Sequence, residues 1–259
     1  MKVYFVGAGP GDPELITVRG MRLLKQAEVV VYAGSLVNPA VLTYAPRAAC
    51  YDSAGMTLEE IVELMVREAS AGKMVVRLHS GDPTLYGALQ EQILALEKRG
   101  VDYEIVPGVS SFTAAAAALG AELTQPGVSQ TVILTRLPGR TPVPAREELE
   151  ALANHRASLC LFLSASRLET AAEALHRGYG QEVPAALVYR ASWPQQRVLS
   201  GELEEVVAGA RAAGLDRSAL LLVGPFLRRQ GGRSLLYHPG FTHGYRRRSN
   251  VRNSGSGLD

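Results

Sequence analysis

The stretch GAGPGDP, residues 7–13, directly follows the short apolar run KVYFV, residues 2–6. A strand that ends in a loop rich in glycine and proline is typical of a site that wraps a phosphate or a nucleotide. The same loop also has a simpler interpretation, in which it only turns the chain into the helix expected after Asp12-Pro13. The fold therefore depends on which kind of loop this is.

A dinucleotide fingerprint is one candidate, and the residues do not fit it. That motif needs the pattern G-x-G-x-x-G and an acidic residue near the end of the second strand. Asp12 stands where the third glycine belongs, and Pro10 and Pro13 remove two amide donors from the turn. The second strand ends in Ala33-Gly34 instead of an acid. No G-K-[ST] follows either, so neither a Rossmann loop nor a Walker loop is expected.

Apolar runs and helical periodicities alternate along the rest of the chain, which predicts an α/β layered structure. The expected strands are residues 2–6, 28–32, 73–78 and 101–106 in a first half, and residues 129–136, 158–163, 185–190 and 219–224 in a second. The expected helices are residues 57–72, 85–100, 111–120, 145–154, 166–178 and 202–213. Thr57 and Glu60 stand in capping-box spacing at the start of the first of these helices. We expect two α/β domains, residues 1–112 and 113–240, with the active site in the cleft between them, and a basic tail, residues 241–259.

Two further loops resemble the first one in composition and in position. HSGDPTLYG, residues 79–87, and PGVSSFTAA, residues 107–115, each follow an expected strand and precede an expected helix. In an open α/β sheet that edge is where ligands bind. Asp82 fits an N-cap or a ligand contact, and Ser110 and Ser111 have the same two interpretations. Three such loops at one sheet edge indicate a binding site more strongly than any one of them.

The composition is that of an ordinary globular protein, because 47% of the 259 residues are hydrophobic and 20% are charged. Cys50 and Cys160 lie far apart, so we expect two reduced thiols. The five histidines show no metal-ligand spacing, and no bound metal is expected. Because the sequence has no signal-peptide pattern and no apolar run near the ~20 residues of a membrane span, we expect a cytoplasmic protein without a membrane partner.

The positive charge is concentrated at the end of the chain. Residues 226–259 carry seven arginines and one acid, a formal charge of +6, which leaves −4 on residues 1–225. A broad nucleic-acid surface is therefore not expected on the folded body. The final stretch, RRRSNVRNSGSGLD, is read as a frayed polar tail, with a nucleic-acid arm as the less favoured interpretation.

The three loops together resemble the tetrapyrrole methylase family, whose members share GxGPGDP after the first strand, a later GDP loop, and VPG followed by small residues. Longer stretches resemble the branch of that family that methylates C11 of the precorrin-4 macrocycle in cobalamin (vitamin B12) biosynthesis. These stretches are YAGSLVNP (32–39), LHSGDPTLYGALQEQ (78–92), VPGVSSFTAAAA (106–117), SQTVILTR (129–136), GRTPVP (139–144), FLSAS (162–166) and FTHGYR (241–246). Uroporphyrinogen-III methylases usually carry an Asp directly after the tyrosine of the second strand. Ala33 stands there in this chain, which argues against that activity.

The resemblance implies a fold that binds S-adenosylmethionine, and releases S-adenosylhomocysteine, without being a Rossmann methyltransferase. The first domain would then lie on the macrocycle side and the second would hold the cofactor pocket. By analogy with the family, the cofactor contacts are Pro10, Gly81, Asp82, Leu85, Ser110, Ser111, Leu163, Tyr189, Ala191 and Ala219. Leu163, Ala191 and Ala219 have equally good structural interpretations as core or loop residues.

The implied substrate is a corrinoid precursor, precorrin-4 or cobalt-precorrin-4, that carries many carboxylates. Arginines at strand ends or in loops could bind those carboxylates in a bidentate manner. The candidates are Arg77, Arg136, Arg140, Arg190 and Arg197, each of which also fits a surface arginine. Methyl transfer from a sulfonium is an in-line displacement that needs alignment and exclusion of water, so no covalent nucleophile is expected and no catalytic base is named.

The resemblance leaves several alternatives open. Another methylase of the same fold would act on C20 or C17 of the macrocycle, on a protein or on RNA, and a non-catalytic tetrapyrrole-binding protein would keep the loops without turnover. Family members are typically homodimers, which is the state expected here. The residues do not decide whether the substrate already contains cobalt, nor whether the tail is ordered.

Overall fold

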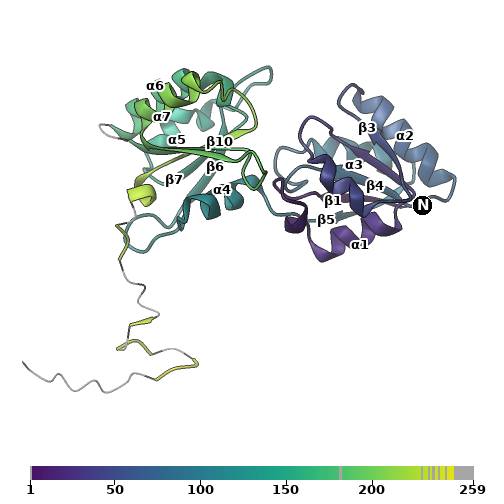
Figure 1. Cartoon of the computed structure of the whole chain (residues 1–259), viewed down its shortest axis with the longest axis horizontal. Coiled ribbons are helices and arrows are strands. Elements are labelled where there is room, and N and C mark those ends of the chain that lie inside the picture. Colours follow the sequence, from purple (N-terminus) through teal and green to yellow (C-terminus); the bar gives the residue numbers. More distant parts are fainter. Residues whose placement is uncertain are drawn as a thin grey trace, which may run out of the picture.

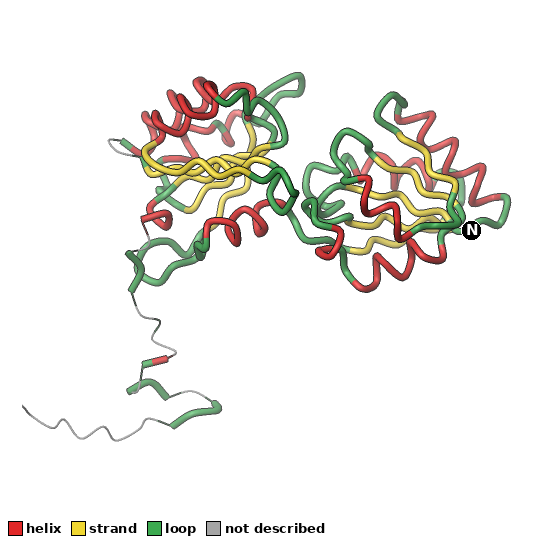
Figure 2. The backbone as a smooth tube through the Cα atoms, in the orientation of Figure 1, coloured by secondary structure: helices red, strands yellow, loops and turns green. Residues whose placement is uncertain are grey.

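Two five-stranded sheets, one in each half of the chain, organise the computed structural model (Figure 1). The structure describes residues 2–180, 183–228, 230–232, 234, 237–238, 240–242 and 244–247. Helices pack on both faces of each sheet, and the strands of one sheet lie in a layer separate from those of the other (Figure 2). The expected α/β class with two α/β units is confirmed.

The first sheet is entirely parallel, with the strand order β3-β2-β4-β1-β5. Its strands are β1 (Lys2–Gly7), β2 (Val29–Tyr32), β3 (Ala49–Asp52), β4 (Val75–His79) and β5 (Asp102–Val106). A Rossmann sheet runs 3-2-1-4, whereas here β4 lies between β2 and β1. The expectation that this is not a Rossmann fold is therefore confirmed by the topology.

Helices cover both faces of this parallel sheet, which explains why β2 is a continuous apolar run and why all five residues of the central strand β4 are buried. The covering helices are α1 (Val18–Gln26), α2 (Leu58–Ser70) and α3 (Leu89–Glu97). Val29 and Val31 pack into the core under α2 and α3, whereas Val30 points into the opposite core beneath α1. Thr57 and Glu60 form the expected capping box at the start of α2.

The second sheet is mixed, with the order β6-β7-β10-β8-β9, in which only β6 and β7 are parallel. Its strands are β6 (Val132–Arg136), β7 (Ser158–Phe162), β8 (Pro184–Tyr189), β9 (Arg197–Glu202) and β10 (Ala219–Val223). One face packs against α5 (Leu149–Ala153), α6 (Leu168–Tyr179) and α7 (Leu203–Ala212). The other face packs against α4 (Ser111–Leu119), the helix that enters the second half, and against the 3₁₀ turn Pro225–Arg228.

All eight expected strands are present, and two edge strands, β3 and β9, were missed. Neither strand contains a buried residue, so neither shows the apolar run that indicates a buried strand. Helix α3 begins at Leu89, four residues later than expected, because Tyr86 and Ala88 adopt left-handed backbone conformations with φ of 55° and 47°. A left-handed residue cannot continue a right-handed helix.

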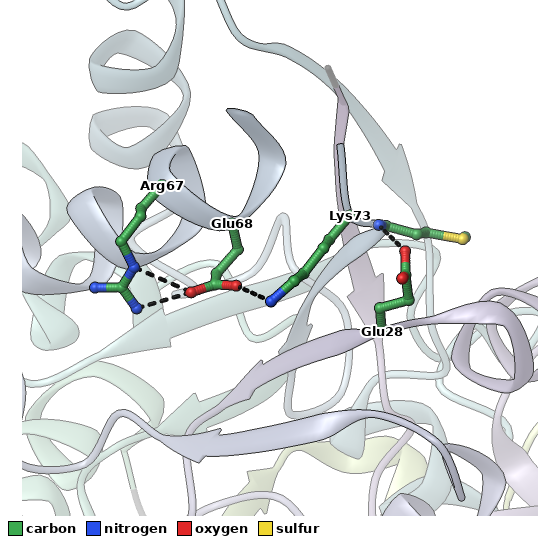
Figure 3. Close-up of polar contacts among 5 residues, drawn as sticks. Glu28, Arg67, Glu68 and Lys73 are labelled. Carbon is green, nitrogen blue, oxygen red and sulfur yellow. Dashed lines mark hydrogen bonds and ion pairs between the residues drawn. The ribbon is translucent and has the colours of Figure 1, made fainter. Parts of the chain in front are cut away.

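A charged network closes the turn between α2 and β4 (Figure 3). Glu68 accepts hydrogen bonds from Arg67 and from Lys73, and the bond from Lys73, followed by that from Arg67, lowers the pKa of the Glu68 carboxyl. Next to it, Glu28 accepts from the backbone amide of Met74. These residues precede β4, at the edge of the sheet away from the glycine-rich loops, so the network stabilises the turn and does not border the candidate site.

The end of the chain lies largely outside the described residues. The predicted basic tail, residues 241–259, is described only in part, and residues 248–259 are outside the description entirely. None of the helices in the described part of the chain combines the length and apolar character needed to cross a membrane.

Candidate functional site

Three loops meet at the carboxyl edge of the first sheet, as the sequence predicts. Strand β1 pairs in parallel with β4 on one side and with β5 on the other, so the loops after these strands are neighbours. They are residues 8–13, 80–88 and 107–110. This edge of an open parallel sheet is where ligands bind in α/β proteins.

Main-chain contacts between glycines hold the three loops together. The amide of Gly81 donates to the carbonyl of Gly9 over 2.8 Å, and the two residues form an isolated antiparallel bridge. Gly7 and Gly108 lie so close that a Cβ atom on Gly7 would sit 2.6 Å from the Gly108 Cα. A Cβ on Gly108 would collide with the Gly81 carbonyl oxygen. The glycines are therefore needed for close backbone approach.

Asp82 joins two of these loops through both of its carboxylate oxygens. Oδ1 accepts from the Thr84 amide over 2.8 Å and from its hydroxyl over 2.5 Å, and Oδ2 accepts from the Gly108 amide over 2.8 Å. Burial raises the pKa of this half-buried carboxyl, but the hydrogen bonds from Thr84 and Gly108 outweigh burial and lower the pKa overall. Asp82 is thus a turn-capping residue and also a link to the loop before α4.

Ser110 and Ser111 begin α4 beside Gly81. An ideal Cβ on Gly81 would lie 3.7 Å from the Ser110 Cα and 3.8 Å from the Ser111 amide. Ser110 is the N-cap residue by position and is buried, yet its side chain makes no cap hydrogen bond. The first amide groups of a helix have no intrahelical partner, and they favour negatively charged groups. This helix start can therefore accept an anionic group.

The predicted residues of the second half gather at the ends of two neighbouring strands. Tyr189 pairs with Ala219 across β8 and β10, and the buried Ala191 follows two residues later. The Arg190 amide donates to the Ser218 carbonyl over 2.8 Å, which fixes the chain where β8 ends. Leu163 follows β7, which pairs antiparallel with β10 so that Leu161 lies opposite Leu221. This register brings Leu163, which is 68% exposed, to the start of β10 at Ala219.

The two halves contact each other through loops that hold most of the predicted residues. The Trp193 indole Nε1–H donates to the Pro10 carbonyl over 2.9 Å, and the Asp12 amide donates to the Ser192 hydroxyl over 3.0 Å. The rings of Tyr86 and Phe162 lie 5.2 Å apart. Leu85 precedes the first of these rings and Leu163 follows the second, so the structure brings those two predicted residues to the same contact region.

Backbone strain is concentrated in these same loops. Among the described residues, seven non-glycine residues have positive φ, and five of them lie in the loops where the halves meet. Those five are Tyr86, Ala88, Leu163, Arg190 and Ser192. Such conformations cost about 1–3 kcal/mol each and cluster at functional sites, where the surrounding structure holds them in place.

One of the five candidate arginines is not where the sequence predicts it. Arg77 is the central residue of β4 and only 6% exposed, so its expected position at a strand end or in a loop is wrong. Its guanidinium donates to Gln92 Oε1 over 3.1 Å, to Ser53 Oγ over 2.9 Å and to the Val31 carbonyl over 3.2 Å. Burial lowers the pKa of Arg77 to about 10. The strand was recognised, but the face to which Arg77 points was not.

The other four arginines lie at strand ends or in loops, as expected. Arg136 ends β6 and donates to the carbonyls of Leu137, Thr141 and Pro142, so it organises the loop that follows. Arg140 is exposed within that loop, and Arg197 is exposed at the start of β9. The Arg190 guanidinium lies over two aromatic rings, 5.3 Å from that of Tyr189 and 5.2 Å from that of Trp193.

His79, which the sequence did not single out, is buried at the end of β4. It is 6% exposed, and its Nε2 atom has no hydrogen-bond partner. Burial and then the charge of Arg77 lower the pKa of this imidazole to about 3. Trp193 and Ser192 were also missed, although the sole tryptophan of the chain, placed between serine and proline beside a strand end, was a usable signal.

The described residues hold no group of three or more histidine, cysteine, aspartate or glutamate side chains arranged to bind a metal ion. Both thiols are free, with Cys50 exposed and Cys160 buried. Burial raises the pKa of Cys160 to about 12, so this thiol stays protonated.

Comparison with known proteins places this arrangement in one family. The family profile of the tetrapyrrole (corrin/porphyrin) methylases matches residues 2–207. A cobalt-precorrin-4 C(11)-methyltransferase of Methanocaldococcus jannaschii is 48% identical over 249 residues, which cover 95% of this chain and 96% of the relative.

Two solved structures agree with this similarity. The structure of a cobalamin biosynthetic enzyme, cobalt precorrin-4 methyltransferase, matches with a TM-score of 0.84 and 46% identity, over 87% of this chain and 95% of that one. A uroporphyrin-III C-methyl transferase of Thermus thermophilus complexed with S-adenosylhomocysteine matches with a TM-score of 0.75 and 36% identity, over 88% of this chain and all of that one. The chain belongs to the tetrapyrrole (corrin/porphyrin) methylase family.

Proposed function

We propose that this chain is an S-adenosylmethionine-dependent C-methyltransferase that methylates C11 of precorrin-4 or cobalt-precorrin-4 in cobalamin biosynthesis. The observation that carries the proposal is the similarity to a cobalt-precorrin-4 C(11)-methyltransferase, which runs along nearly the whole of both chains at 48% identity. Glycine contacts and strained loops at the carboxyl edge of the first sheet provide a built site for that reaction.

The residues at this edge suit S-adenosylmethionine. The start of α4, with Ser110 and Ser111, suits the carboxylate of the methionine part, because unpartnered amide groups and hydroxyls bind anions. Apolar side chains on the facing loops suit the adenine and the ribose edge. They include Leu163, which is 68% exposed in the free chain, and the nearby Ala191 and Ala219. Asp82 supports this site by holding the Gly81 and Gly108 loops together.

Methyl transfer requires little of the protein beyond binding the two reactants and aligning them. S-adenosylmethionine supplies a methyl group on a positively charged sulfur, so the methyl moves to the macrocycle carbon while the sulfur leaves as a neutral thioether. The chain has to hold the two reactants in line and keep water away from the methyl group. The candidates to bind macrocycle carboxylates are the exposed Arg140 and Arg197, and Arg190, whose guanidinium stacks on the rings of Tyr189 and Trp193. Arg136 shapes the loop that carries Arg140.

Isotope labelling tests both the activity and its position. Purified protein is incubated with S-adenosylmethionine labelled with ¹³C in its methyl group and with precorrin-4 or cobalt-precorrin-4. We expect one labelled methyl, located at C11 by NMR, and calorimetric binding of S-adenosylhomocysteine. Label at C20 or C17 of the macrocycle, or transfer of the label to RNA or protein, would show that C11 is not the methylated position. Binding of the macrocycle without any transfer would indicate a non-catalytic tetrapyrrole-binding protein.

We further propose that the protein acts as a cytoplasmic homodimer with neither nucleic-acid nor membrane partners. The net charge of −4 on residues 1–225 supports the absence of a nucleic-acid surface on the folded body. Light scattering after size exclusion should give twice the 27.7 kDa of one chain. A monomeric mass would contradict the dimer without affecting the proposed reaction.

A further inference from the structure

One side chain connects the two halves directly at the candidate site. Trp193 lies in the loop between β8 and β9, residues 190–196, which we call the tryptophan loop. Its indole Nε1–H donates to the Pro10 carbonyl over 2.9 Å. Trp193 and Pro10 lie 183 positions apart in the chain. The neighbouring Ser192 hydroxyl adds a second link, across 180 positions, by accepting from the Asp12 amide.

The indole packs closely against Gly11, and we call this position of the ring its seat. A Cβ atom on Gly11 would collide with the five-membered part of the indole ring, so only a glycine leaves room for this contact. The Arg190 guanidinium lies over the same ring, 5.2 Å from its centroid. An indole that is already covered in this way is not a free platform for stacking a macrocycle. It acts as an anchor between the halves.

The anchor joins two loops that the proposed reaction must keep in register. On one side is loop 8–13 at the end of β1, and on the other is the chain directly after β8, where Tyr189 and Ala191 are proposed to contact the cofactor. Arg190 and Ser192 have φ of 45° and 67°, a strained backbone that the contact helps to hold. A change at Trp193 therefore reaches both loops at once.

We propose that Trp193 is a positioning residue for methyl transfer, which fixes loop 8–13 against the end of β8 so that the macrocycle and the methyl donor meet in line. The inference rests on the proposed function, because alignment matters only if a group is transferred between ligands of the two halves. In-line displacement is sensitive to small misplacements of the reacting atoms. Weakening the link lowers kcat, whereas the affinity for the cofactor alone changes little.

The kinetic test uses Trp193→Phe, which keeps an aromatic ring but removes the Nε1–H donor. We expect kcat to fall between about 2-fold and about 10-fold, the range for loss of one hydrogen bond, while the Kd for S-adenosylhomocysteine changes less than about 2-fold. Ser192→Ala, which removes the second link, should lower kcat in the same direction. Ser200→Ala on β9 is the matched control, because Ser200 is exposed and outside the tryptophan loop.

A second test needs neither turnover nor ligand. Trp193 is the only tryptophan in the chain, so intrinsic fluorescence reports on its seat alone. Gly11→Ala should displace the indole, shift its emission to longer wavelength and increase its quenching by acrylamide. Gly55→Ala is the control, because a Cβ there meets nothing within 4 Å. Far-UV circular dichroism confirms that both variants are folded.

The outcomes separate this inference from the proposed function. Unchanged emission in Gly11→Ala would overturn the inference, since the indole would not occupy that seat. So would a Trp193→Phe variant that loses thermal stability but keeps its kcat, because the role would then be only structural. If the wild-type protein transfers no methyl group, the proposed function fails. The proposed positioning role of Trp193 then fails as well, even if the fluorescence comparison still shows that the indole packs on Gly11.

Discussion

The chain contains two G-D-P sequences, and exchanging the aspartate of each for asparagine tests what Asp82 does. Asp82 bonds to Thr84 within its own turn and to the Gly108 amide in another loop. Asp12 in the first G-D-P sequence caps its own turn by accepting from the Glu14 amide over 2.9 Å. Asp12→Asn is therefore a matched control for Asp82→Asn, since asparagine also caps such turns well.

The expected magnitude follows from the hydrogen bonds of the carboxylate. An asparagine side chain has one oxygen, which can accept from Thr84 or from Gly108 but cannot reach both as the two carboxylate oxygens do. In either orientation of the asparagine, its side-chain nitrogen would face another hydrogen-bond donor, either the Thr84 amide or the Gly108 amide. A hydrogen bond to a charged group contributes about 1.5–3 kcal/mol, so we expect the Gly108 loop to open about 10- to 150-fold more often.

Hydrogen exchange measures that opening directly in the free protein. The Gly108 amide should lose protection by this factor in Asp82→Asn and should keep its protection in Asp12→Asn. Equal protection of Gly108 in all three proteins would refute the reasoning. If Asp82→Asn then still weakened binding of S-adenosylhomocysteine, the carboxylate would act on the ligand itself, as the family resemblance implies.

Two further predictions concern the same sheet edge. Gly108→Ala places a methyl group against the Gly81 carbonyl and should destabilise the protein by about 1–3 kcal/mol, seen as a lower urea midpoint than in Gly55→Ala; equal midpoints would contradict the close contact. Burial and then the charge of Arg77 lower the pKa of His79 to about 3 in the folded chain, whereas it is about 6.5 in the unfolded chain. Between these two pH values the unfolded chain therefore binds a proton that the folded chain does not. Stability is therefore retained above about pH 6.5 and falls as the pH drops towards 3, by up to about 2 kcal/mol between pH 7 and pH 5. A His79→Gln variant with the same pH dependence as the wild type, measured by urea unfolding, would show that this imidazole is not responsible.

Local signals in the sequence determined much of the fold and of the site. The eight apolar strands, the capping box of Thr57 and Glu60, and the glycine-rich loops after three parallel strands depend on residues close together in the chain. Such patterns are visible in a single sequence because the period of each element and its end signals are local. They placed Gly81, Asp82 and Ser110 together at one sheet edge without knowledge of the strand order.

Only the tertiary structure decided what these residues contact. The Trp193–Pro10 bond spans 183 residues, and no periodicity records a contact between two loops of different sheets. The sequence places Arg77 near a strand end, as a candidate to bind substrate carboxylates, but the strand order buries it in β4 between β2 and β1 with Gln92 and Ser53 as partners. The edge strands β3 and β9 were not predicted, because strands without buried residues lack the apolar pattern. Burial, pairing at a distance and backbone strain arise only when the whole chain has packed, and those three properties gave this site its final form.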